Sequence, residues 1–162
     1  MAFHRRLVNK RAIVEKIIAQ LSSELETYAQ SARSAHAEAT DEQSKAENKY
    51  DTRGLEASYL ARGQSRQAAE VAEAIEHFTK LELREFATDE GIDVGALIEL
   101  ETPTARAFYF LGPRAGGTEI VAGKKEIWVI TPQSPLGQQL MGRKRGEQIS
   151  GRSGPQRIVA VS

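Results

Sequence analysis

Residues 14–39 read VEKIIAQLSSELETYAQSARSAHAEA and contain no proline. Steps of four and three residues alternate between eight apolar positions: Val14, Ile18, Leu21, Leu25, Tyr28, Ala32, Ala35 and Ala39. That spacing places all eight on one helix face and is typical of an α-helical coiled coil. The side chains are large in the first half and mostly alanine in the second, so we expect two paired helices to approach more closely toward residue 39.

A second stretch, from about residue 46 to residue 87, keeps the same spacing. Its predicted seam is Ala57, Leu60, Gln64, Gln67, Val71, Ala74, Phe78 and Leu81. Two heptad segments joined by a short polar segment predict an antiparallel helical hairpin. The turn is expected near residues 40–47, at the tip of the hairpin.

Proline and glycine divide the chain into two regions. Residues 1–102 contain no proline, and ten of the thirteen glycines lie after residue 91. The charge divides there too, because residues 1–91 hold 13 Lys or Arg against 16 Asp or Glu, whereas residues 92–162 hold 9 against 6. We therefore predict a helical hairpin over residues 1–90 and a second domain over residues 91–162.

The second region alternates short apolar segments with turn residues. Strands are predicted at residues 95–101, 106–111, 126–130 and 156–161. Between the last two, Ser134 suits a helix N-cap, Pro135 the first helical position and Gly142 the C-terminal cap, which predicts a short helix. The fold class is then α+β: an antiparallel coiled-coil hairpin followed by a small antiparallel sheet domain with one short helix.

Composition excludes several functional classes. The formal net charge is zero, which argues against a general nucleic-acid binder, and the absence of cysteine excludes thiolate metal sites and cysteine nucleophiles. No 18-residue apolar window or secretory signal is present, so we expect a cytoplasmic protein without a membrane partner. His4, His36 and His77 lack metal-ligand spacing, and no Ser/His/Asp arrangement is visible, so we expect no independent active site and no enzyme.

The stretch ITPQSPLGQQLMGRKRGEQI, residues 130–149, resembles the C-terminal signature of the Gre family of bacterial transcript cleavage factors. That family carries a strand, Ser-Pro-Leu/Ile-Gly/Ala, a short helix, Leu-hydrophobic-Gly-Lys and Gly-Asp/Glu. The matching segments are residues 134–137, 140–144 and 146–147, and residues 110–113 resemble the family's Ile-Val-Gly segment. The resemblance implies that the second domain is FKBP-like.

The tip departs from the family pattern, which is close to Gly-Asp-x-x-Glu-Asn. Here Glu47 and Asn48 match the Glu-Asn pair, but the residue three positions before Glu47 is Ser44. A short insertion would instead bring Asp41 or Glu42 into the acidic role. Both alignments stay open at this point, and so does a plain solvated turn in which Asp41 caps the second helix.

The resemblance implies a factor that binds core RNA polymerase, inserts its coiled coil into the secondary channel and stimulates the polymerase's own cleavage of backtracked RNA. Asp41, Glu42 and Glu47 would be the tip carboxylates, assisting Mg²⁺ shared with the polymerase active site, with no cofactor of the chain's own. Contact with the nascent RNA 3′ end would be indirect, and we expect a monomer. Polymerase binding would use the C-terminal positions Ser134, Pro135, Leu136, Arg143 and Lys144.

Three other hypotheses remain. A protein of the same fold could occupy the channel without stimulating cleavage, which the altered tip favours. The FKBP-like domain could be a prolyl isomerase, which needs an aromatic-lined pocket. A generic coiled-coil adaptor would leave the Ser-Pro motif unexplained. The basic residues at 143–145 also suit a helix C-terminus, where cations are favoured.

Overall fold

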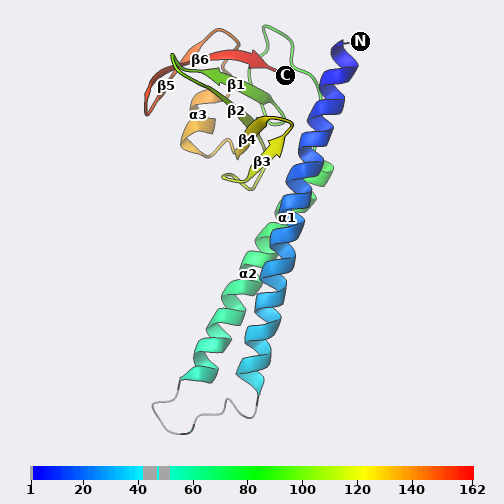
Figure 1. Cartoon of the computed structure of the whole chain (residues 1–162), viewed down its shortest axis with the longest axis vertical. Helices are drawn as coiled ribbons and strands as arrows, with labels where there is room; N and C mark the ends of the chain where they lie inside the picture. The colour runs from blue at the N-terminus through cyan, green and yellow to red at the C-terminus, as the bar shows by residue number, and fades with distance from the viewer. Residues whose placement is uncertain (1, 42–46, 48–51) are drawn as a thin grey trace. The chain divides into compact units, whose positions relative to one another are not determined.

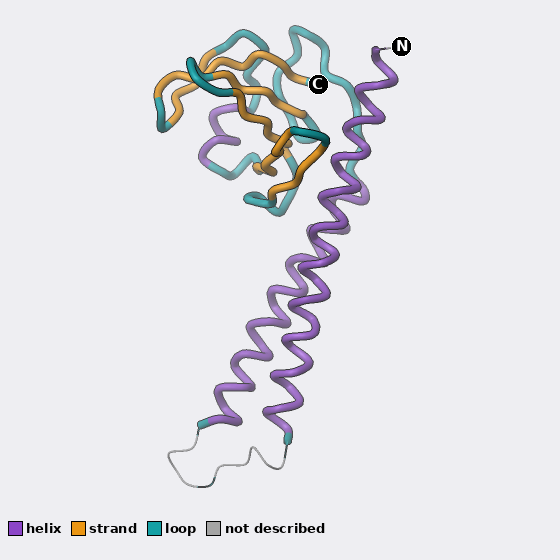
Figure 2. Tube along the Cα trace, in the orientation of Figure 1, coloured by secondary structure: helices purple, strands orange, loops and turns teal. Residues whose placement is uncertain are grey.

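The computed structural model describes residues 2–41, 47 and 52–162, with side chains from residue 10 onward. Helices α1 (Ala2–Thr40) and α2 (Arg53–Lys80) precede a six-stranded sheet and a short helix, α3 (Pro135–Leu140) (Figures 1 and 2). The strands are β1 (Leu97–Glu101), β2 (Arg106–Leu111), β3 (Glu119–Ala122), β4 (Lys125–Ile130), β5 (Gln148–Gly151) and β6 (Gly154–Val161). This element order confirms the predicted α+β class. The division into domains at residue 90 stays a prediction.

Two compact units make up the chain. One consists of residues 20–75 and is called the hairpin unit below; the other consists of residues 1–19 with residues 76–162 and is called the sheet unit. Both long helices therefore contribute to both units. None of the helices described is long and apolar enough to cross a membrane.

The hairpin unit contains the predicted α1 seam. Leu21, Ala32 and Ala35 are buried, and the other seam positions, Leu25 and Tyr28 among them, are half-buried. Because α1 and α2 are the only elements described in this unit, each helix covers the buried face of the other. The heptad prediction is confirmed here.

The predicted α2 seam is wrong at two positions. Leu60 is 53% exposed whereas its neighbour Ala61 is only 9% exposed, and Gln67 is exposed whereas Ala68 is half-buried. The buried face therefore passes through Ala61 and Ala68, one residue later than predicted. The α1 seam consists of alanines at this level, so small side chains on α2 permit a close approach that leucine would block.

Helix α2 ends at Lys80 instead of continuing to residue 87. Residues 81–96 are irregular, and from this segment Phe86, Ile92 and Ala96 enter the core of the sheet unit. One continuous helix could not direct all three into the same core. The backbone N–H of Ala87 donates to Glu90 Oε2 at 3.0 Å, which satisfies one donor in the irregular segment.

The sheet has the strand order β3-β4-β2-β1-β6-β5. All four predicted strands are present, and the sequence missed β3 and β5. Neighbouring strands pair antiparallel except β2 and β4, which are parallel, so the predicted antiparallel sheet is present with one parallel pair within it. Strand β3 forms a hairpin with β4 at the edge of the sheet, which lets the chain return to β2 in the parallel direction.

Apolar side chains cover both faces of the sheet. On one face, Leu140 of α3 packs in a cluster with the strand residues Ile98, Leu100, Leu111, Ile130, Ile149 and Ile158. On the other face, Phe110 of β2 lies against Phe78 of α2, with their ring centroids 6.4 Å apart. The sheet unit therefore has apolar packing on both faces around the C-terminal ends of β2 and β4.

Candidate functional site

The Ser-Pro motif folds as a capped helix. The Ser134 hydroxyl donates to the Thr131 carbonyl at 2.7 Å and accepts from the Gly137 backbone N–H at 3.1 Å, so Ser134 is the predicted N-cap of α3. Pro135 occupies the first turn. A Cβ on residue 137 would lie 1.8 Å from the Thr131 carbonyl oxygen, so only glycine fits there.

The turn after α3 depends on two glycines. Gly142 has φ of 75°, a left-handed conformation that suits glycine at a helix C-terminus. Its N–H donates to the Ile92 carbonyl, and the Ile92 N–H donates to the Arg143 carbonyl, both at 2.8 Å. A Cβ on Gly91 would lie 2.9 Å from the Gly142 carbonyl oxygen. The segment before β1 therefore holds the turn that carries Arg143 and Lys144.

Glu147 closes this turn. Its carboxylate accepts from the Lys144 backbone N–H and lies 3.4 Å from the Arg143 guanidinium. The backbone N–H of Lys144 holds the pKa of Glu147 below its usual value, and Arg143 adds to the shift. The Gly-Glu end of the motif thus orders a turn whose basic side chains lie at the surface.

The five predicted polymerase-binding residues fall into two groups. Ser134 caps α3, and Leu136 packs against the core cluster, so both have structural roles. Pro135, Arg143 and Lys144 are exposed. The arrangement presents a short, rigid surface with an exposed proline at the start of α3 and two cations after its end.

The predicted tip acids lie between α1 and α2. Asp41 directly follows α1 and is exposed, and its N–H donates to the Glu38 carbonyl at 3.4 Å. Glu47 is exposed, with Oε1 4.0 Å from the Arg53 guanidinium. Glu42 lies outside the described residues. Within the described part of the chain, no three acidic or histidine side chains are grouped to hold a metal ion.

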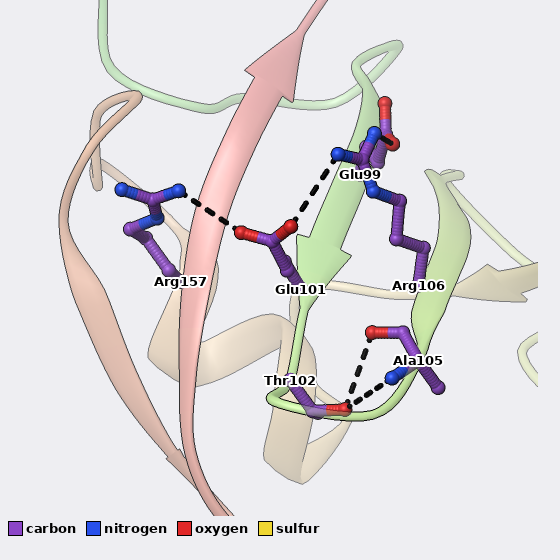
Figure 3. A network of polar contacts seen from close by, with 6 residues as sticks. All are labelled: Glu99, Glu101, Thr102, Ala105, Arg106 and Arg157. Carbon is purple, nitrogen blue, oxygen red and sulfur yellow. Dashed lines mark hydrogen bonds and ion pairs between the residues drawn. The ribbon is translucent and has the colours of Figure 1, made fainter.

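A polar network on the sheet was not anticipated from the sequence (Figure 3). Arg106 donates to Glu99 at 2.8 Å and lies 3.4 Å from Glu101, which also accepts from Arg157 at 2.9 Å. The Arg157 guanidinium is the largest influence lowering the pKa of Glu101. Alternation along β1 puts both glutamates on one face, and that signal was available in Glu-Leu-Glu, residues 99–101. The network cross-links β2, β1 and β6.

A buried lysine was also missed. Lys10 is 1% exposed, its Nζ donates to the carbonyls of Arg84 and Ser162, and it lies 4.9 Å from the Phe86 ring centre. Burial, followed by the Arg84 charge, lowers its pKa from 10.5 to about 8, and Glu85 acts in the opposite direction. Lys10 lies four residues before Val14 on the same helix face, which was the available signal.

No protein-family model and no curated protein matches the chain. Among solved structures, the GreA factor homolog 1 (Gfh1) protein of Thermus thermophilus is 21% identical, with 90% of this chain and 94% of that chain covered and a TM-score of 0.37. Gfh1 of Thermus aquaticus is 21% identical, with 99% and 94% covered and a TM-score of 0.35. The prokaryotic transcription elongation factor GreA/GreB from Nitrosomonas europaea is 17% identical, with 62% and 79% covered and a TM-score of 0.32. The likeness is one of fold alone.

Proposed function

We propose that this chain is a Gre-type transcription factor that binds RNA polymerase and acts with it in the cytoplasm. The hairpin unit would enter the secondary channel, and the carboxylates between α1 and α2 would stimulate the polymerase's own cleavage of backtracked RNA. The chain itself would be no enzyme.

The observation that carries the proposal is the motif from Ser134 to Glu147. Each of its unusual residues has a defined structural role, since Ser134 caps α3, Gly137 accommodates a carbonyl, Gly142 turns the chain and Glu147 closes the turn. The result is an ordered surface that exposes Pro135, Arg143 and Lys144. A backbone turn held in this way favours a protein interface, because little loop order has to be imposed on binding.

The donor chemistry at the tip fits a shared magnesium ion. Mg²⁺ prefers oxygen ligands and often takes only one or two carboxylates, with phosphate and water completing its shell. Asp41 and Glu47 are exposed carboxylates, so they could supply such a partial set, whereas the described residues offer no complete site. Mg²⁺ bound between polymerase and tip would supply Lewis-acid stabilisation of the reacting oxygens. The chain's own contribution would be to bring negative oxygen atoms to that place and orient them.

A second function is favoured by the tip sequence. With Glu47 and Asn48 aligned to the family pair, Ser44 stands where the family has an acid. One carboxylate fewer would weaken metal retention while leaving the polymerase-binding surface intact. On this alternative the chain occupies the channel and modulates transcription without stimulating cleavage.

A cleavage assay on stalled, backtracked elongation complexes separates the two. Full-length protein is added to purified complexes, and shortening of the RNA is followed alongside polymerase binding. Stimulated cleavage supports the first function, and binding without cleavage supports the second. Failure to bind core polymerase would overturn both.

Single carboxamide variants test the tip. Asp41→Asn, Glu42→Gln and Glu47→Gln remove charge at nearly constant size, and each is expected to reduce cleavage with little change in polymerase affinity. Glu70→Gln, at an exposed position within α2, is the matched control. Normal cleavage by all three tip variants would exclude these carboxylates from the reaction.

A further inference from the structure

A hollow of about 330 Å³ lies at the start of the parallel strands β2 and β4. The side chains that matter for its chemistry are Arg106, Phe108, Lys124, Lys125, Glu126 and Trp128. The tight turn at Gly123 (φ 64°) brings Lys124 and Lys125 to the hollow from the β3–β4 hairpin. Aromatic rings and cations therefore meet at one end of the sheet.

The cations of the hollow are not equivalent. Arg106 is engaged by Glu99 and Glu101 in the network of Figure 3. Lys125 lies over the Phe108 ring, with Nζ 4.7 Å from the ring centre. Across residues 10–41, 47 and 52–162, neither Lys124 nor Lys125 has a carboxylate partner. Two positive charges thus remain available at the rim.

Apolar surface lies beside those charges. Trp128 is 41% exposed and Val121 of the neighbouring edge strand is 55% exposed, which is unusual for large apolar residues in a domain with a well-filled core. Tyr109 pairs with Trp128 and shares its face of the sheet, whereas Phe108, which lies under Lys125, is on the opposite face; both rings are half-buried. Exposed tryptophan is enriched at protein-binding surfaces.

We propose that an acidic segment of a partner protein binds in this hollow across the open end of β2 and β4, with an apolar side chain against Trp128 on one face and its carboxylates on Lys124 and Lys125. Charge complementarity carries the choice of occupant, because the residues from 92 onward have a surplus of three positive charges and these two lysines have no acidic partner among the described residues. A hollow of this volume receives one or two side chains.

A nucleic acid fits the same place less well. Single-stranded nucleic acid needs a positive groove that follows several phosphates and aromatic side chains for successive bases. Here the positive charge is confined to one end of two strands, so it could contact few successive phosphates. The compact arrangement therefore favours a short acidic peptide.

The surface is separate from the Ser-Pro motif. Strands β2 and β4 run parallel, so Arg106 and Lys125 lie at one end, whereas Leu111 and Ile130 lie at the end that leads to α3. Five residue steps along a strand correspond to about 16 Å. The proposal therefore does not depend on the proposed function, and the two surfaces can be tested independently.

Trp128 provides a local signal because it is the only tryptophan of the chain. Full-length protein is titrated with the capped peptide DEFDE, the uncharged peptide NQFNQ and a ten-nucleotide oligouridylate. Tryptophan emission and the single indole N–H resonance are recorded. DEFDE is expected to shift both signals saturably and to bind at least tenfold more tightly than either other probe.

A charge-matched pair of variants assigns the site. Lys124→Gln with Lys125→Gln should weaken DEFDE binding at least tenfold, whereas Arg145→Gln with Arg152→Gln, also exposed and also removing two charges, should leave it within twofold. Equal thermal stability of both double variants excludes unfolding as the cause.

Three results would overturn the proposal. They are the absence of any Trp128 response to DEFDE, equal affinity for DEFDE and NQFNQ, and tighter binding of the oligouridylate than of DEFDE. The last would assign the lysines to nucleic-acid binding. None of these outcomes bears on polymerase binding through the Ser-Pro motif.

Discussion

The hairpin unit and the sheet unit bury different kinds of side chain. In the hairpin unit, the described buried apolar residues are Leu21 and the alanines at positions 32, 35, 57, 61 and 74. In the sheet unit, isoleucine, leucine and phenylalanine dominate, with Phe78, Phe110 and Ile127 almost completely buried. Each buried methylene contributes about 0.8 kcal/mol, so a seam of alanines stabilises two helices much less than the sheet core stabilises its strands. Small side chains make a slender rod, and the rod is correspondingly easy to destabilise.

The tightest packing in the sheet unit gives the largest expected effect. Gly137→Ala would place a methyl group 1.8 Å from the Thr131 carbonyl oxygen, a backbone atom that also accepts a hydrogen bond from the Ser134 hydroxyl. We expect a loss of more than about 4 kcal/mol in the free energy of unfolding. Urea denaturation followed by Trp128 fluorescence measures it, since Trp128 lies in the sheet unit. A loss below about 1 kcal/mol would mean that the Ser-Pro turn is loosely packed.

The next largest effect is expected at Leu21, the only large side chain that is buried among the described residues of the hairpin unit. Leu21 is 2% exposed, so Leu21→Ala should cost about 2–5 kcal/mol. Leu60→Ala is the control, because Leu60 is largely exposed and should cost less than about 1 kcal/mol. Helix unfolding followed by circular dichroism measures both. If both variants lost the same free energy of unfolding, Leu60 would be buried between the helices, and the register through Ala61 would be wrong.

Lys10 makes stability depend on pH in the sheet unit. Its pKa is about 8 in the folded chain against 10.5 when unperturbed, so between these values the unfolded chain binds a proton that the folded chain lacks. Stability attributable to this group therefore rises with pH across that window, by about 3 kcal/mol at 1.4 kcal/mol per pKa unit. Below pH 8 Lys10 is charged in both the folded and the unfolded chain, so burial of its charge lowers stability by the full amount.

The measurement is the difference between two pH profiles. Wild type and Lys10→Met are denatured with urea from pH 7 to pH 10.5, and the rise should be absent from the variant. Groups common to both proteins cancel in the comparison. Parallel profiles would show that Lys10 has an ordinary pKa in the folded chain.

The smallest expected effect is a gain in the hairpin unit. Gly63 lies within α2, and a Cβ there would meet no atom within 4 Å. Gly63→Ala should therefore stabilise the chain by about 0.5–1 kcal/mol, because alanine loses less backbone entropy in a helix. The same substitution thus has opposite signs at positions 63 and 137. A destabilised Gly63→Ala variant would indicate that a further surface packs against α2 there.

The sequence predicted elements whose side chains obey a local rule. The α1 seam, the strand at residues 106–111 and the Ser134 cap all follow from spacing or from one hydrogen-bonding side chain. The α2 register was mispredicted because Leu60 and Ala61 fit two alternative helix faces, and the choice depends on what α1 presents opposite them. Tertiary packing overrides hydrophobicity at that point.

The missed features are short strands and contacts between residues far apart in the chain. Strands β3 and β5 have only four residues each and gain their order from pairing with β4 and β6. Lys10 can be buried because its side-chain nitrogen donates hydrogen bonds to the carbonyls of Arg84 and Ser162. For the candidate site, the motif at 134–147 was visible in the sequence, whereas the hollow beside Trp128 requires the parallel pairing of β2 with β4.

The contact between Lys10 and Ser162 joins residues that are 152 positions apart, and it has a consequence for synthesis on the ribosome. The helical residues before position 20 are synthesised well before residues 76–162, with which they form the sheet unit. Translation adds about 5–20 residues per second, so the apolar side chains of Ile13 and Ile17 stay uncovered for several seconds before the residues they pack against are made. Residues 20–75 are complete long before that, so the rod can pair while the rest of the molecule is still being translated.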